Sequence, residues 1–129
     1  MIAAMTTRRM PTEGELDILN VLWTRGPSTV RDVAEALGRT DAYTTVLKLL
    51  QIMAEKRLVT RREAGRSHIY SAASSREATQ QHLVQDLLRR AFGGSAAQLV
   101  LQALSTAKAT PEELDAIRKL LDQHRGGRR

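Results

Sequence analysis

The chain has 129 residues, the size of one domain or of a small domain with an appendage. It has no cysteine, which excludes disulfides, thiolate metal sites and cysteine nucleophiles. Twenty basic residues against 14 acidic ones leave a net charge of +6, and the isoelectric point of about 10.5 is typical of a protein that binds nucleic acid.

Three helices are expected in the first part of the chain. Thr12 and Glu15 have the spacing of a capping box, and apolar residues then recur at helical spacing as far as Gly26. Ser28 or Thr29 is expected to cap a second, shorter helix. A third helix follows, and its predicted inner face consists of Tyr43, Val46, Leu47, Leu50, Met53 and Ala54.

A β-hairpin is predicted next, because the apolar period changes from about 3.6 to about 2 beyond residue 57. One strand starts at Leu58 and runs to Glu63, and residues 67–70 form the return strand. Gly65 lies in the turn between them, where it can adopt a positive φ. Three helices followed by a basic hairpin form the winged helix-turn-helix arrangement, so we expect a mainly α fold with a small β-hairpin.

Charge is distributed unevenly over these elements. Residues 13–41 carry six acids against three arginines, whereas residues 42–72 carry six basic residues against two acids. The positive charge gathers where the third helix meets the hairpin, and such clustering attracts a polyanion. A recognition helix presents its N-terminal residues to DNA bases, and hairpin cations suit the phosphate backbone. The predicted DNA-binding residues are Ala42, Thr44, Thr45 and Lys48 on the helix and Arg61, Arg62 and Arg66 on the hairpin.

The two adjacent hairpin arginines are not equivalent. Side chains alternate along a strand, so Arg61 and Arg62 are expected on opposite faces and one of them on DNA. Arg66, at the tip, is the best single candidate for a backbone contact. Tyr70 is expected in the core.

The remainder of the chain shows only helical patterns. Ser74 and Glu77 have capping-box spacing, and Ser95 and Thr110 are expected to begin two further helices. Helices of this length bury their apolar faces poorly alone. They either pack on the N-terminal part of the chain or interlock with those of a second subunit, and we favour the second arrangement. The predicted dimerisation residues are Val84, Leu87, Leu88, Val100, Leu101, Leu104, Leu114, Ile117 and Leu121.

An enzyme is not expected from these patterns. The three histidines, His68, His82 and His124, match no zinc-ligand spacing, and no glycine-rich loop joins a strand to a helix to hold phosphates. We therefore predict no catalytic residue, metal or cofactor. No apolar run suits a membrane span or a signal peptide, so a cytoplasmic protein without membrane insertion is expected.

Four segments in order carry the most specific signal: TEGELDILNVLW at 12–23, STVRDVAEAL at 28–37, AYTTVLKLLQIMAEKRLV at 42–59 and GRSHIY at 65–70. Together they resemble the penicillinase-repressor family of the BlaI/MecI/CopY type, from about Pro11 to Leu121. The resemblance implies a homodimeric winged-helix repressor of β-lactamase or stress genes, which binds palindromic double-stranded operators of TACA/TGTA type. In the best-known members, a membrane sensor-protease senses β-lactam and the repressor is then cleaved in its dimerisation region.

Departures from the family pattern limit what the resemblance implies. Ile52 stands where the recognition helix commonly has arginine, and Arg57 where glycine is frequent at the helix C-terminus. Gln102 and Ala103 align with the scissile Asn–Phe pair and mark the possible cleavage region. The C-terminal cysteines of the copper-responsive branch are missing. The resemblance therefore covers the fold and DNA binding and leaves the inducing signal open.

The predicted organisation has four parts: an N-terminal segment (1–11), a winged helix-turn-helix domain (12–72), a helical dimerisation region (73–125) and a basic tail (126–129). The predicted function is sequence-specific repression of transcription by a homodimer. Two alternatives stay open. One is a winged-helix regulator that senses a ligand or metal through His68 or His82. The other is a helical protein–protein adaptor whose basic face is incidental.

Overall fold

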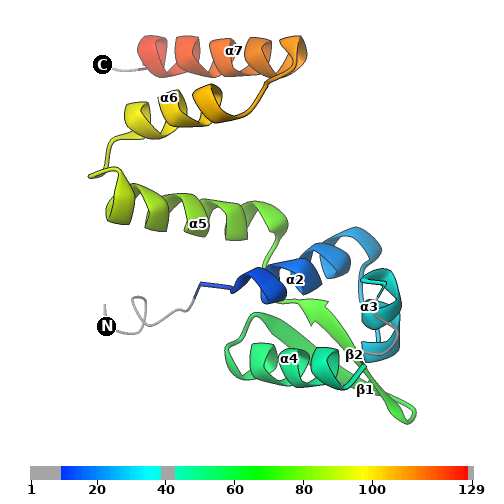
Figure 1. The fold of residues 1–129 in the computed structure, drawn as a ribbon. Coiled ribbons are helices and arrows are strands. Elements are labelled where there is room, and N and C mark those ends of the chain that lie inside the picture. Colours follow the sequence, from blue (N-terminus) through cyan, green and yellow to red (C-terminus); the bar gives the residue numbers. More distant parts are fainter. Residues whose placement is uncertain (1–9, 39–42, 128–129) are drawn as a thin grey trace. The chain divides into compact units, whose positions relative to one another are not determined.

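The computed structural model describes residues 10–38 and 43–127. The chain divides into two compact units, residues 1–84 and 85–129, which we call the N-terminal and C-terminal units. The boundary falls within α5. The elements in chain order are α2 (Glu13–Arg25), α3 (Val30–Ala36), α4 (Tyr43–Glu55), β1 (Val59–Ala64), β2 (Ser67–Ala72), α5 (Arg76–Ala91), α6 (Ala96–Thr106) and α7 (Pro111–Gly127) (Figure 1).

The N-terminal unit has the predicted winged helix-turn-helix fold, in which three helices and a hairpin enclose one core. Each element contributes apolar side chains at the spacing that its secondary structure requires. Tyr70 is fully buried, as expected, and is among the largest residues of this core. The buried apolar residues are Ile18, Leu19, Leu22, Val30, Val33, Ala34, Val46, Leu50, Met53, Val59 and Tyr70.

Local capping defines where the first two helices begin. The Thr12 hydroxyl accepts from the Glu15 amide at 3.2 Å, and the Glu15 carboxylate accepts from the Thr12 amide at 2.9 Å, which confirms the predicted capping box. Thr29, rather than Ser28, caps α3, and it forms a second capping box with Asp32. These reciprocal bonds satisfy amides that a helix N-terminus otherwise leaves unpaired.

The hairpin is extended by a third, minimal strand. β1 and β2 pair antiparallel from Val59 opposite Ala72 to Ala64 opposite Ser67, so the turn is the two-residue Gly65-Arg66. Ser28 exchanges two backbone hydrogen bonds with Tyr70, of 3.0 and 2.8 Å. The loop between α2 and α3 is thus tied to the outer side of β2. This bridge between residues 42 positions apart was not expected from the sequence.

The C-terminus of α4 ends in a Schellman motif. The Leu58 amide donates to the Met53 carbonyl at 2.9 Å and the Arg57 amide to the Ala54 carbonyl at 3.1 Å. Arg57 has a φ of 67°, the left-handed conformation that glycine adopts most readily. The position where the family frequently has glycine is therefore left-handed, and here it holds the bulkier Arg57.

Two details of the predicted elements are wrong. Tyr43 does not lie on the inner face of α4, since 45% of its surface is exposed. Ser74 does not cap α5: the Ser75 hydroxyl accepts from the Ala78 amide at 3.0 Å instead. The Ser74 carbonyl accepts a hydrogen bond from the indole N–H of Trp23 at 2.9 Å.

The C-terminal unit contains capped helices but no buried core. Ser95 and Thr110 begin α6 and α7, as predicted: the Ser95 hydroxyl accepts from the Gln98 amide, and Thr110 forms a reciprocal capping box with Glu113. No described residue of α5, α6 or α7 is buried, so the predicted dimerisation residues are partly or fully exposed on the single chain. None of the described helices is both long and apolar enough to cross a membrane.

Candidate nucleic-acid interface

One face of α4 does not pack against the core, and it carries residues of this helix that were predicted to contact DNA. Val46, Leu50 and Met53 are buried, whereas Thr44, Thr45 and Lys48 on the other side are exposed. Thr45 and Lys48 are three residues apart and therefore lie on one face over consecutive turns. Ala42, the remaining predicted contact on this helix, lies outside the described residues.

The hairpin provides a second exposed basic element. Arg66 is at the two-residue tip, where Gly65 has a φ of 64°, as its predicted role in the turn requires. Arg61 pairs with Tyr70 and Arg62 with Ile69, so the two arginines point to opposite faces of the hairpin, as alternation predicts. All three arginines are exposed.

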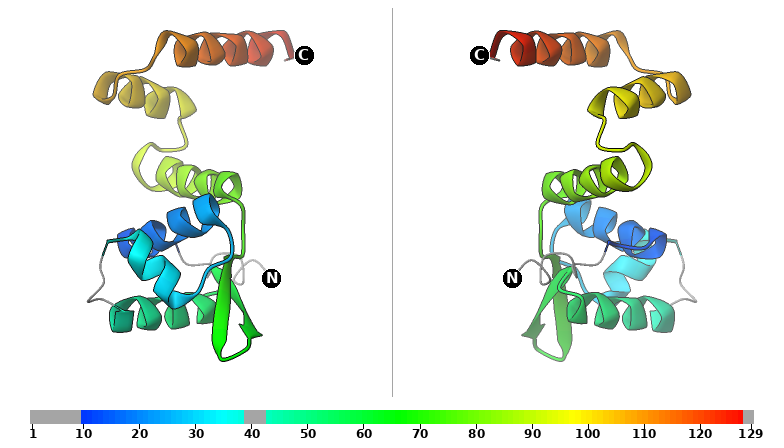
Figure 2. Two further views of the ribbon diagram at one scale, coloured as in Figure 1. Left: turned by 90° about the vertical axis from the view of Figure 1, so that its right-hand side faces the viewer. Right: turned by 90° about the vertical axis from the view of Figure 1, so that its left-hand side faces the viewer.

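The hairpin tip and α4 lie on the same side of the N-terminal unit. In both views of Figure 2, α4 and the tip form its lower edge, and α2 lies on the other side. An open groove of about 560 Å³ runs between α4 and β1. Its lining shows that Arg61 is beside the C-terminal half of α4; the lining residues are Gln51, Ala54, Glu55, Val59, Thr60 and Arg61.

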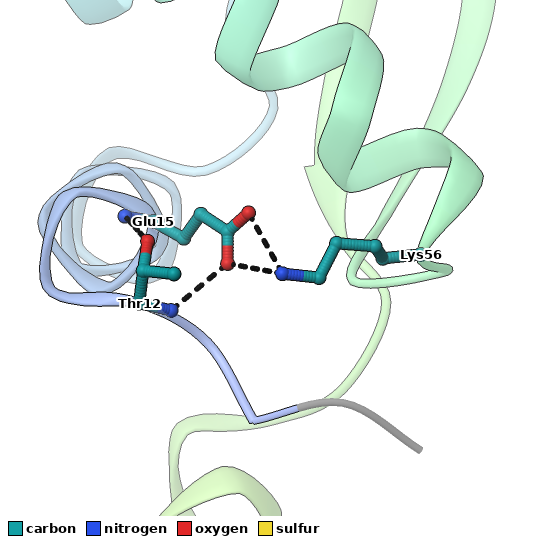
Figure 3. Close-up of polar contacts among 3 residues, drawn as sticks. All are labelled: Thr12, Glu15 and Lys56. Atoms are coloured by element: carbon teal, nitrogen blue, oxygen red, sulfur yellow. Dashed lines mark hydrogen bonds and ion pairs between the residues drawn. The ribbon is translucent and has the colours of Figure 1, made fainter. Parts of the chain in front are cut away.

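A buried ion pair holds α4 against α2. The Lys56 ammonium donates to both carboxylate oxygens of Glu15, at 2.7 and 3.0 Å (Figure 3). Only 12% of the Lys56 side chain and 3% of the Glu15 side chain are exposed. The same carboxylate serves the capping box with Thr12, so one group joins the start of α2 to the end of α4. Sequence reasoning assigned Glu15 to the cap and missed its partner 41 residues away.

Opposing effects determine the protonation of the two capping carboxylates. Burial raises the pKa of Glu15, but the hydrogen bonds from Lys56 and Thr12 outweigh it and the net pKa is lowered. The Thr29 backbone amide likewise lowers the pKa of Asp32. Both groups are therefore anionic at neutral pH, and each is engaged in a local contact.

A polar cluster anchors the beginning of α5 on α2. Besides the Trp23–Ser74 hydrogen bond, the Arg76 guanidinium lies 5.6 Å from the centre of the Trp23 ring and donates to the Thr24 hydroxyl at 3.2 Å. The cation over the ring and the two hydrogen bonds restrict how the chain leaves the hairpin.

The predicted metal alternative gains no support from the described residues. His68 lies 3.8 Å from Glu63 across the hairpin, and His82 is on α5. No group of three or more histidine, aspartate or glutamate side chains gathers there to hold a metal ion.

Two side chains on α4 were not among the predicted contacts. Tyr43 lies in the first turn beside Thr44, and Ile52 lies one turn beyond Lys48, with 38% of its surface exposed. A helical projection that placed the centre of the apolar face at Val46, Leu50 and Met53 could have shown that Ile52 lies outside this face.

The comparisons with known proteins agree with this geometry. A family model described as "Penicillinase repressor" matches residues 11–123. The chain belongs to the penicillinase-repressor family. The resemblance noted from the four sequence segments is thereby confirmed. Transcriptional regulation of the BlaI type is the function that this family indicates.

Individual relatives in this family differ in their similarity. "Transcriptional regulator BlaI" of Mycobacterium tuberculosis is 34% identical over 119 residues, which cover 88% of this chain and 86% of the relative. "Penicillinase repressor" of Bacillus licheniformis is 20% identical over 116 residues, covering 88% and 91%. Among solved structures, apo-NmtR in solution is 32% identical with a TM-score of 0.45, covering 68% of this chain and 66% of the other. The curated relatives are named as regulators rather than enzymes, in line with the non-enzymatic expectation at the level of the family.

Proposed function

We propose that this penicillinase-repressor family member acts as a homodimer on a palindromic operator of TACA/TGTA type, in control of β-lactamase or stress-response genes. α4 enters the major groove, and the hairpin tip contacts the backbone. The observation that carries the proposal is that Thr44, Thr45 and Lys48 are exposed opposite the core, on the side of the unit that also bears Arg66.

Charge supports this orientation. The interval 42–72, which contains α4 and the hairpin, has a net charge of +4 from six basic and two acidic residues. In contrast, Glu15 and Asp32 of the preceding acidic interval are committed to capping boxes and ion pairing. A polyanion is therefore attracted to the face of α4 and the hairpin.

The open apolar positions of the C-terminal helices support dimerisation by residues 73–125, with residues 12–72 as the DNA-binding part. Leu88 and Ile117 are half-buried on the single chain, and the other predicted residues, among them Leu101 at 61%, are exposed. Leu120, at 53%, joins them and was not predicted. Exposed apolar side chains in such number mark an interface, and a second copy matches the two-fold symmetry of a palindrome.

The possible cleavage region, Gln102 and Ala103, lies inside α6. Both carbonyls are engaged by helical contacts: the Thr106 hydroxyl donates to Gln102 at 2.9 Å, and the Ala107 amide donates to Ala103 at 3.1 Å. Proteolytic nicking favours exposed loops over intact helices, so cleavage by a sensor-protease here requires this turn of α6 to open.

Thr45→Ala tests the reading of bases by α4. We expect it to lose about 1–3 kcal/mol of binding free energy on a TACA-N-TGTA palindrome, the range for a specifying contact, and little on random DNA. Gel shifts on the palindrome and on a scrambled duplex measure both values. Equal losses on the two duplexes would assign Thr45 to the backbone instead. Indistinguishable binding of the wild type to both duplexes would refute sequence-specific recognition of this operator.

Arg66→Ala tests the hairpin contact. If Lys48, Arg66 and one of Arg61 or Arg62 each neutralise a phosphate, a dimer covers about six, and the slope of log K against log salt is about −5. The variant alters both wings, so the slope should become shallower by about 2 while sequence preference survives. Titrations at about 50–200 mM salt measure it, with Glu35→Lys as a charge control away from the interface. An unchanged slope in Arg66→Ala would mean that Arg66 does not contact the DNA backbone.

A further inference from the structure

Ile52 is an exposed aliphatic side chain that the core does not explain. Of the large hydrophobic residues described in α2, α3, α4 and the hairpin, Tyr43 and Ile52 are the exposed ones, and both are on α4. Ile52 is absent from the partly buried side chains that pack against the core, whereas Leu47, Leu49 and Ala54 of the same helix are among them. A β-branched residue is also no better than average as a helix former, so propensity does not account for it.

Ile52 shares its face of α4 with a polar and a cationic side chain. Thr45, Lys48 and Ile52 are spaced i, i+3 and i+7 and therefore lie on one face of the helix. An interface for another protein offers a contiguous apolar patch, whereas here one aliphatic side chain stands among hydrogen-bonding and positively charged groups.

This combination matches the edge of a thymine in the major groove, where one apolar methyl group lies among hydrogen-bonding atoms and phosphates. We propose that Ile52 contacts the 5-methyl group of a thymine in each half-site and so helps to specify the operator. The proposal rests on the proposed function, since it assigns a base to a position on the same recognition face.

The helix geometry predicts which thymine is read. Ile52 lies seven residues beyond Thr45, which is about 10 Å along a helix axis, and base pairs are stacked about 3.4 Å apart. The thymine that contacts Ile52 therefore lies at most about three base pairs from the position that responds to Thr45→Ala. The two side chains read separate positions.

The test uses the full-length protein and a duplex selected by it from a random double-stranded pool. Each thymine of the selected half-site is replaced by deoxyuridine, symmetrically in both half-sites, which removes only the methyl group. For the wild type we expect one such replacement to raise Kd about fourfold for each methyl lost, hence about 15-fold for the pair. Ile52→Ala should bind the thymine duplex about as weakly and no longer distinguish it from the deoxyuridine duplex. Glu35→Ala, an exposed change on α3, should retain the full discrimination.

A second variant tests base preference as well as affinity. Ile52→Arg should change the preferred base pair at that position toward G·C, because arginine donates two hydrogen bonds to guanine. Equal deoxyuridine penalties for the wild type and Ile52→Ala at each thymine would overturn the assignment of Ile52 and leave repression by this fold intact. A random pool from which no sequence is enriched would instead overturn the proposed function, and this inference with it. Circular dichroism of each variant verifies that α4 is retained.

Discussion

Lysine at both Leu101 and Leu104 is expected to convert the proposed dimer into a monomer. The two side chains are 61% and 41% exposed on the single chain, and they belong to the apolar positions of α6 that we assign to the subunit interface. Four ammonium groups in an apolar dimer interface would have to be desolvated without partners, which is strongly unfavourable. The loss of the second DNA-binding unit should weaken operator binding by about 100-fold or more, because the two half-sites are no longer bound by one linked molecule.

Sedimentation equilibrium measures the loss of the dimer, and gel shifts measure the loss of operator binding on the same samples. The matched control is lysine at Gln98 and Gln102, which adds the same charges to exposed polar positions of the same helix. A control variant that dimerises and binds like the wild type isolates the effect of the apolar face. If the Leu101 and Leu104 variant also sediments as a dimer, α6 is not the interface.

Lys56→Met is expected to cost about 3 kcal/mol of unfolding free energy, because it leaves the Glu15 carboxylate buried without its counter-ion. For a unit of this size that corresponds to a decrease in Tm of about 12–24 °C. The double variant Glu15→Gln with Lys56→Met should recover most of the loss, since the amide oxygen of glutamine can still accept from Thr12 and no charge remains buried. Lys48→Met, an exposed change on the same helix, should alter stability by less than about 0.5 kcal/mol.

The same pair predicts an acid-sensitive stability. The pKa of Glu15 is lower in the folded state than its ordinary value of 4.5, so its contribution is fully present above that value and is lost as pH falls through the folded pKa. Chemical unfolding between pH 3 and pH 7 should show a shallower loss of stability in the Glu15→Gln, Lys56→Met double variant than in the wild type. If the wild type and the double variant lose stability in parallel as pH falls, other carboxylates dominate the acid response. If Lys56→Met has a thermal stability similar to that of the wild type, the ion pair contributes little.

The ion pair also bears on DNA binding, because it fixes the C-terminal end of α4. Glu15 and Lys56 join the first turn of α2 to the C-terminus of α4. The Ser28–Tyr70 bridge ties the hairpin to the loop between α2 and α3 by two backbone hydrogen bonds. The side chains that we assign to bases and phosphates thus project from elements whose positions are held by buried contacts, as precise recognition requires.

Much of the N-terminal unit could be predicted from short-range patterns. The capping box at Thr12 and the turn at Gly65 act over two to four residues, and the structure confirms them. The alternation that separates Arg61 from Arg62 is equally local. The apolar period of α4 correctly predicted that Thr45 and Lys48 are on its exposed side. The roles of these residues in DNA binding stay predictions.

The amino-acid sequence by itself determined the order of the elements, most of their boundaries and the family, because caps, turn glycines and apolar periods are set by neighbouring residues. Only the tertiary structure decided which polar groups meet: Glu15 with Lys56, Ser28 with Tyr70, and Trp23 with Ser74, at separations of 41 to 51 residues. It also decided that Tyr43 and Ile52 are exposed. Helical spacing gives the angle of a side chain around its own axis, but the neighbouring elements determine how wide an arc of that helix they cover.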